Sequence, residues 1–216
     1  MISHKYNCIF VHIPKAGGTS IEDLIWPSKR DRTEEHLWGG FIDGVSHRYQ
    51  TGGLQPLTGR LIREAVGQND FDRYYKFTFA RNPWDKAVSQ FSYMKTRSDA
   101  RTILGLTQDT DFKTYLSLIR KVDHVQWKPQ YEFFLDENGD QMVDFVGRLE
   151  NFNEDVMHVI NHLDVRKGLL RRKIDSIPHS KKSSRSHYKD YYDAESREIV
   201  AEMYQRDIEL LNYTFD

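Results

Sequence analysis

The sequence predicts an α/β fold with a mainly parallel β-sheet flanked by helices. Short apolar runs typical of buried strands alternate along the chain with amphipathic segments typical of helices. Two of the predicted strands lead directly through a turn into a helix, which is where α/β proteins bind ligands. The length of 216 residues and the aromatic content of 13% suffice for a substantial core, and they favour one domain over residues 1–216.

The first predicted strand covers residues 6–13, because these residues are mostly β-branched or aromatic. It ends before Pro14. A turn at Gly17 and Gly18 then leads to a helix capped by Thr19 or Ser20. The elements expected next are a polar loop at 28–56, a helix at 58–66, a strand at 74–80, a helix at 85–93 and a helix ending at 119 behind the cap Asp111.

The second half of the chain begins with an ambiguous segment at 126–135. A turn at Asn138-Gly139 indicates a hairpin leading to a strand at 142–146. One amphipathic helix is expected from Asn151 to residue 163, and a single helix at 194–211. His158 and His162 lie one turn apart on the first of these helices, where they can bind a metal, although packing is the favoured interpretation.

Charge and cysteine content exclude several classes of protein. The 31 Lys and Arg residues balance 32 Asp and Glu residues, and this net charge of −1 argues against a nucleic-acid-coating protein. One cysteine excludes an internal disulfide and a paired-cysteine zinc site. No apolar run is long enough to span a bilayer, and the first ten residues do not resemble a signal peptide. We therefore expect a cytoplasmic protein without a membrane span.

The first motif is the segment Pro14–Ser20, which lies between a predicted strand and a predicted helix. Its glycines let backbone N–H groups approach an anion, and the helix N-terminus and hydroxyls add further donors. Lys15 precedes the glycine pair, so the segment is not a Walker sequence, in which the lysine follows the second glycine. The alternative is a tight turn with a solvated lysine.

The second motif follows the strand at 74–80. Arg81 stands at the carboxyl end of this strand, where its guanidinium can bind a phosphate through two hydrogen bonds. Ser89 lies about two turns further along and adds a hydroxyl. The alternative is that Arg81 pairs with Asp85 and that Ser89 is a surface residue.

These segments resemble known motifs: residues 11–20 the 5′-phosphosulfate loop of sulfotransferases, and residues 79–89 their 3′-phosphate motif. Weaker matches follow in the family's order at 127–130, 144–150 and 187–192, and the likeness is strongest to carbohydrate sulfotransferases and their bacterial relatives. The resemblance implies a three-layer fold related to the P-loop nucleotide kinases. It also implies metal-free transfer of a sulfuryl group from 3′-phosphoadenosine 5′-phosphosulfate (PAPS) to a hydroxyl or amine, with 3′-phosphoadenosine 5′-phosphate (PAP) as product.

The resemblance also assigns roles to residues. Arg81 and Ser89 would hold the 3′-phosphate, and Ser183 and Arg185 would lie in a loop that closes over the nucleotide. The basic stretch 166–189, with nine Lys or Arg and one acid, fits an anion-facing role or a solvated face. Lys15 would neutralise the bridging oxygen as the bond breaks, and the 5′ side would be held by Lys15, Ala16, Gly17, Gly18, Thr19 and Ser20.

The acceptor and the general base are less well defined. Trp127 and Gln130 either line an acceptor pocket, for a small molecule or a glycan, or belong to the core. The family has a histidine before the helix at 58–66, but this chain has Pro56 there, so His47 is our candidate base, ahead of His36 and Glu64. Lys181 replaces an expected asparagine. These departures keep two alternatives open: a small-molecule kinase, and a nucleotide- or glycan-binding relative with impaired catalysis.

Overall fold

The computed structural model describes residues 1–25, 57–97, 104–163 and 185–216. The chain divides into two compact units. The first comprises Met1–Ala80 and Glu132–Lys181, and the second comprises Arg81–Tyr131 and Lys182–Asp216. The single domain expected over 1–216 stays a prediction.

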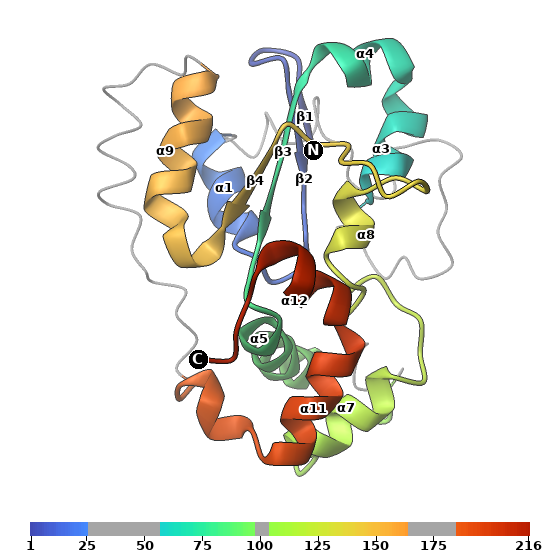
Figure 1. The fold of residues 1–216 in the computed structure, drawn as a ribbon, viewed down its shortest axis with the longest axis vertical. Coiled ribbons are helices and arrows are strands. Elements are labelled where there is room, and N and C mark those ends of the chain that lie inside the picture. Colours follow the sequence, from blue (N-terminus) through green and yellow to red (C-terminus); the bar gives the residue numbers. More distant parts are fainter. Residues whose placement is uncertain (26–56, 98–103, 164–184) are drawn as a thin grey trace. The chain divides into compact units, whose positions relative to one another are not determined.

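The first unit contains a four-stranded sheet in the order β1-β2-β3-β4 (Figure 1). Its strands are β1 (Ile2–Ser3), β2 (Cys8–Val11), β3 (Tyr75–Ala80) and β4 (Phe145–Arg148). β1 runs antiparallel to β2, whereas β2, β3 and β4 are parallel, with Val11 opposite Thr78 and Phe79 opposite Gly147. The predicted α/β class with a mainly parallel sheet is confirmed.

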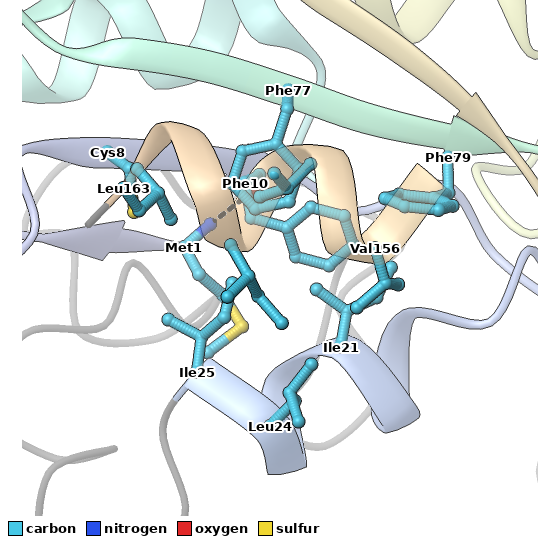
Figure 2. Packing of buried hydrophobic residues seen from close by; sticks show 12 residues of the cluster. Met1, Cys8, Phe10, Ile21, Leu24, Ile25, Phe77, Phe79, Val156 and Leu163 are labelled. Atoms are coloured by element: carbon cyan, nitrogen blue, oxygen red, sulfur yellow. Dashed lines mark hydrogen bonds between the residues drawn. The ribbon is translucent and has the colours of Figure 1, made fainter. Parts of the chain in front are cut away.

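One face of this sheet packs on α1 (Gly18–Ile25) and α9 (Phe152–His162). Every residue of β2 and all but the first of β3 are buried, as expected for strands covered on both faces. Figure 2 shows how the side chains on this face interdigitate, and the nitrogen of Met1 donates to the carbonyl of Phe10 at 2.7 Å. The core cluster comprises Met1, Cys8, Phe10, Ile21, Leu24, Ile25, Phe77, Phe79, Val156, Val159, Ile160 and Leu163.

The other side of the sheet is covered by α3 (Gly59–Val66) and α4 (Gln68–Arg73), as Figure 1 shows. Lys76 of β3 points to this side, where its Nζ lies 5.4 Å from the ring centre of Phe71. α3 begins one residue after the predicted start at residue 58, because Thr58 is its N-cap: the Thr58 hydroxyl accepts from the backbone N–H of Leu61. The short helix α8 (Tyr131–Phe134) occupies part of the segment that the sequence left ambiguous.

The second unit is helical. It contains α5 (Pro83–Thr96), α7 (Phe112–Ile119), the 3₁₀ helix η2 (Tyr188–Tyr191), α11 (Ala194–Met203) and α12 (Gln205–Leu211). Phe91 of α5 packs against Phe112 and Tyr115 of α7, with ring centres 5.5 and 5.2 Å apart. The predicted cap of α7 is confirmed, because Asp111 accepts from the N–H of Thr114 at 2.7 Å.

Several predicted boundaries are wrong: β2 is shorter than the strand expected at 6–13, and α5 is longer than the helix expected at 85–93. α1 begins at Gly18, so Thr19 and Ser20 lie in its first turn instead of capping it. The last strand begins at Phe145, where its parallel register with β3 starts, instead of at residue 142. The helix predicted at 194–211 is broken at Tyr204, whose φ is −123° and whose hydroxyl is fixed to the carbonyl of Trp127 at 2.8 Å.

α9 follows a 3₁₀ turn, η1 (Leu149–Asn151), and carries the two histidines that the sequence placed one turn apart. His158 stacks on Phe145 with ring centres 4.4 Å apart, and His162 stacks on Tyr75 at 3.8 Å. Both rings therefore have a packing role, and no metal-binding cluster is found among the described residues. In this part of the chain no helix has the length and hydropathy needed to cross a membrane.

Candidate functional site: two anion-binding segments

The segment Pro14–Ser20, the anion loop, connects β2 to α1 in the first unit. Two of its residues adopt left-handed backbone conformations, Lys15 at φ 63° and Gly17 at φ 85°. The Ala16 N–H donates to the carbonyl of Ile13, which closes the turn. Because the first N–H groups of a helix have no intrahelical partner, the start of α1 at Gly18 provides donors and a positive dipole end for an anion.

Both glycines of the loop are required by close packing. A Cβ on Gly17 would lie 2.7 Å from Cδ1 of Leu149, and a Cβ on Gly18 would collide with the imidazole ring of His12. Lys15 and Ser20 are half-buried, Thr19 is exposed, and Ala16 is buried. The loop thus combines a bare backbone, a cation and two hydroxyls within a few residues, which is the chemistry that a phosphate or sulfate requires.

The second anion-binding segment starts at Arg81 in the second unit, directly after β3. Asn82 caps α5, since its Oδ1 accepts from the N–H groups of Trp84 and Asp85, and Pro83 occupies the first turn. The Asn82 amide also donates to the carbonyl of Thr214 at 2.7 Å. These bonds fix the turn that leads from Arg81 into α5.

Arg81 and Arg185 both bind the carboxylate of Asp85. Nε and Nη2 of Arg81 donate to Oδ2 of Asp85 at 2.8 and 2.7 Å, and Nη2 of Arg185 donates to Oδ1. The three side chains are only 13%, 12% and 23% exposed for Arg81, Arg185 and Asp85, respectively. Burial by itself would raise the pKa of Asp85, but the charge of Arg81 and the hydrogen bonds from both arginines lower it.

This cluster of Arg81, Asp85 and Arg185 carries two cations and one anion. The Arg81–Asp85 pair is the alternative that the sequence offered for Arg81, and the structure adds Arg185 as the second guanidinium. Ser89 lies one helical turn beyond Asp85 on α5 and is half-buried. Residues 81, 85 and 89 are therefore spaced along one side of the start of α5, and two guanidinium groups are gathered beside them.

Gln130, for which the sequence left an acceptor pocket and the core open, contacts the backbone of Arg81. Its side chain is fully buried, its Oε1 accepts from the N–H of Arg81 at 2.9 Å, and its Nε2 donates to the carbonyl of Arg81 at 2.8 Å. Trp127 is also buried, and its Nε1 donates to the carbonyl of Val122 at 2.6 Å. These contacts give Gln130 the position of a support for Arg81 and Trp127 that of a core residue.

Asp207 and Lys86 bind the backbone of the segment that contains Gln130. The carboxylate of Asp207, fully buried, accepts from the N–H groups of Gln130 and Tyr131 at 2.7 and 2.8 Å. Lys86 of α5 donates to the carbonyl of Lys128 at 3.2 Å. Burial lowers the pKa of Lys86 to about 8, although the charge of Asp207 partly offsets it, and burial raises the pKa of Asp207.

Several of these residues were missed by sequence reasoning. Asp207 follows Val200 and Tyr204 on the apolar stripe of the last helices, and Lys86 lies beside Ala87 on the buried side of α5. A charge on an apolar helix face is the signal that was available, because such a charge needs a buried partner. The partner of each residue was not readable from the sequence.

Other predicted residues lie outside the described part of the chain. These are His47 and His36 from the polar loop, Pro56, and Ser183 with Lys181 from the basic stretch. Glu64, the remaining candidate base, lies on α3 and is exposed. The structure does describe three of the residues expected to hold the nucleotide outside the 5′ loop, namely Arg81, Ser89 and Arg185. All three belong to the second unit.

The fold is of the α/β class, and the glycine-rich loop between β2 and α1 and the arginine cluster after β3 are each a candidate anion-binding segment. The chain matches the model of the sulfotransferase family over residues 1–214 and belongs to that family. A relative from Archaeoglobus fulgidus, itself an uncharacterized protein, is 36% identical over 103 residues, which cover 48% of this chain and 78% of the relative.

The fold is that of a solved sulfotransferase. The crystal structure of mouse sulfotransferase SULT7A1 complexed with PAP matches with a TM-score of 0.61 and 13% sequence identity, covering 99% of this chain and 91% of that chain. The sulfotransferase fold expected from the resemblance is therefore confirmed.

Proposed function

We propose that this protein transfers a sulfuryl group from PAPS to a hydroxyl or amine of an acceptor, with carbohydrates among the candidate acceptors. The observation that carries the proposal is the gathering of Arg81 and Arg185 on Asp85 directly after β3. A nucleotide with a 3′-phosphate, unlike ATP, requires a second anion site in addition to the glycine loop. Family membership supports the choice of PAPS.

The donor supplies an activated sulfuryl group on a phosphate leaving group. In the proposed reaction Lys15 neutralises charge on the bridging oxygen, and the backbone N–H groups of Gly17 and Gly18 hold the 5′ side together with Thr19 and Ser20. The bare backbone at both glycines fits such an approach, because no Cβ shields the N–H groups there. Arg81, Arg185 and Ser89 hold the 3′-phosphate, with Ser183 as a further proposed ligand.

A general base must accept the proton of the acceptor. We keep His47 as the candidate, because Pro56 has no proton-accepting side chain and stands where the family has a histidine. The expected result for His47→Gln is a loss of transfer with unchanged affinity for PAP. Unchanged transfer in this variant would exclude His47 as the base.

The first experiment compares PAP with AMP by calorimetry without magnesium. The two ligands differ only in the 3′-phosphate, and each charge-assisted hydrogen bond to it is worth about 1.5–3 kcal/mol, so PAP is expected to bind tens of times more tightly or better. Arg81→Ala should abolish this preference. The matched control is Arg120→Ala, because Arg120 is half-exposed and pairs with Glu202 within the same unit.

Each outcome discriminates among the candidate functions. Equal, weak binding of PAP and AMP would overturn the proposal, and tighter binding of ATP with magnesium would favour a kinase. Selective PAP binding without transfer from PAPS to a broad panel of acceptors, glycans included, would identify a binding protein that has lost catalysis.

A further inference from the structure

His12 and Glu22 join the two ends of the anion loop. His12 is the first residue after β2, and Glu22 lies in the second turn of α1. Nδ1 of His12 is 2.7 Å from Oε1 of Glu22, so the bond encloses the entire loop between them. Since a carboxylate only accepts hydrogen bonds, Nδ1 carries the proton in this pair.

The face of the His12 ring also supports the loop from within. A Cβ placed on Gly18 would meet Nε2, Cδ2 and Cε1 of His12 at nearly equal distances. Three ring atoms at equal distance mean that the imidazole presents its face, and not its edge, to Gly18. The Phe10 ring lies nearly parallel to the imidazole, at 26° and 5.6 Å between centres. The ring thus has a fixed orientation under the first residue of α1.

The pair also provides a buried carboxylate with a hydrogen-bond donor. The side chain of Glu22 is only 4% exposed, against 26% for His12. A buried carboxylate needs a hydrogen-bonded partner, and an unpaired one beside the loop would repel an incoming anion. The Nδ1–H of His12 is a hydrogen-bond partner that satisfies the Glu22 carboxylate.

We propose that His12 and Glu22 are positioning residues of the anion loop. By fixing the first turn of α1 against the end of β2, they hold the backbone N–H groups in the arrangement that binds the 5′ side of the nucleotide before it arrives. This inference rests on the proposed function. It differs from the roles of Lys15 and Arg81, because neither His12 nor Glu22 is required to touch the ligand.

The test is calorimetric affinity for PAP and for AMP in folded variants, with folding checked by circular dichroism and thermal unfolding. His12→Ala is expected to weaken both ligands by the same factor, about tenfold or more, and to leave their ratio unchanged. Arg81→Ala instead changes the ratio. A purely structural role for His12 would lower the melting temperature without this common loss of affinity.

Two further variants sharpen the result. His12→Asn keeps a donor near the position of Nδ1 and should restore part of the affinity lost in His12→Ala. Combining His12→Ala with Glu22→Ala should cost little more than His12→Ala alone, because the double variant leaves no unpaired carboxylate. If His12→Ala does not fold, Glu22→Gln replaces it, and a smaller loss by a common factor is then expected.

His4→Ala is the matched control. Nδ1 of His4 is 2.6 Å from the hydroxyl of Tyr74, a comparable bond in the same unit, but His4 lies before β2 and far along the strand from the loop. Its loss should leave both affinities unchanged. Wild-type affinities in folded His12→Ala and Glu22→Gln would overturn the inference, as would a changed PAP-to-AMP ratio. A wild-type protein that does not prefer PAP would overturn the proposed function instead.

Discussion

The side-chain amide of Gln130 pairs with both backbone groups of Arg81, accepting from its N–H at 2.9 Å and donating to its carbonyl at 2.8 Å. A side-chain amide offers a donor and an acceptor side by side, which matches the N–H and carbonyl of one residue. The backbone of Gln130 is in turn bound by Asp207. The position of the Arg81 guanidinium therefore depends on residues that do not belong to the turn that carries it.

Replacing Gln130 should reduce nucleotide selectivity. Gln130→Leu removes both hydrogen bonds between the Gln130 amide and the backbone of Arg81, which costs roughly 2–4 kcal/mol of stability for the two lost bonds. The preference for PAP over AMP should fall, but less than in Arg81→Ala, because the guanidinium is still present. Chemical denaturation and calorimetry measure the two effects. Full selectivity in a folded Gln130→Leu variant would contradict the support that we assign to Gln130.

Asp85 should make stability depend on acidic pH. Its pKa is lowered from the ordinary 3.8 in the folded state, so its ion pairs contribute fully above about pH 4 and are lost as the pH falls below that value. Asp85→Asn should be less stable at neutral pH, since two guanidinium groups then face each other. The difference between the two proteins in urea unfolding should shrink from pH 6 to pH 3. A constant difference would show that the pair does not contribute through charge.

Lys86 should make stability depend on alkaline pH, with the same sign as Asp85: stability rises as the pH rises. Its folded-state pKa of about 8 lies below the ordinary 10.5, so the unfolded chain binds more protons between these values. Stability should therefore rise with pH across this window, by an amount on the order of 3 kcal/mol at most. Lys86→Met should lack this rise, which denaturant titrations between pH 8 and 10 would detect. The same slope in both proteins would mean that Lys86 is not buried as a cation.

Gly18→Ala should destabilise the protein because the added methyl group collides with the His12 ring, and not because of backbone strain. Gly18 has an ordinary negative-φ backbone at the start of α1, where alanine is otherwise favourable, but the added Cβ meets the His12 ring. We expect a loss of about 1–3 kcal/mol from this overpacking. In a His12→Ala background the same substitution should be neutral or stabilising. The test is a comparison of the melting temperatures of the wild type, Gly18→Ala, His12→Ala and the double variant. Additive effects of the two substitutions would exclude a contact between the added Cβ and the His12 ring.

The sequence predicted those elements whose signal is local. The apolar run of β2, the glycines of the anion loop and the cap Asp111 all act within a few residues, and the structure has each of them. The shift of β4 and the break at Tyr204 depend on contacts with distant segments, namely the register with β3 and the bond to Trp127. Such contacts have no local pattern.

The residues of the candidate site show the same difference between local signals and contacts with distant segments. The loop at 14–20 and Arg81 were recognisable because their residue types stand at fixed spacing after strands. The pairing of Gln130 with Arg81 joins residues far apart in the sequence, so the sequence pattern leaves both an acceptor pocket and the core open for Gln130. The bond between His12 and Glu22 was within reach, because both residues flank a recognised motif, but a histidine at the end of a strand has many possible partners.

The register between β3 and β4 has a consequence for how the chain acquires its fold. Phe77 is paired with Phe145, and the whole of the segment Arg81–Tyr131 must be synthesised between the two strands. Until β4 emerges from the ribosome, β3 has an open edge with a row of aromatic side chains, which is a template for aggregation. Truncated chains that stop before residue 145 should therefore be insoluble, and non-local pairing of this kind predicts slow folding.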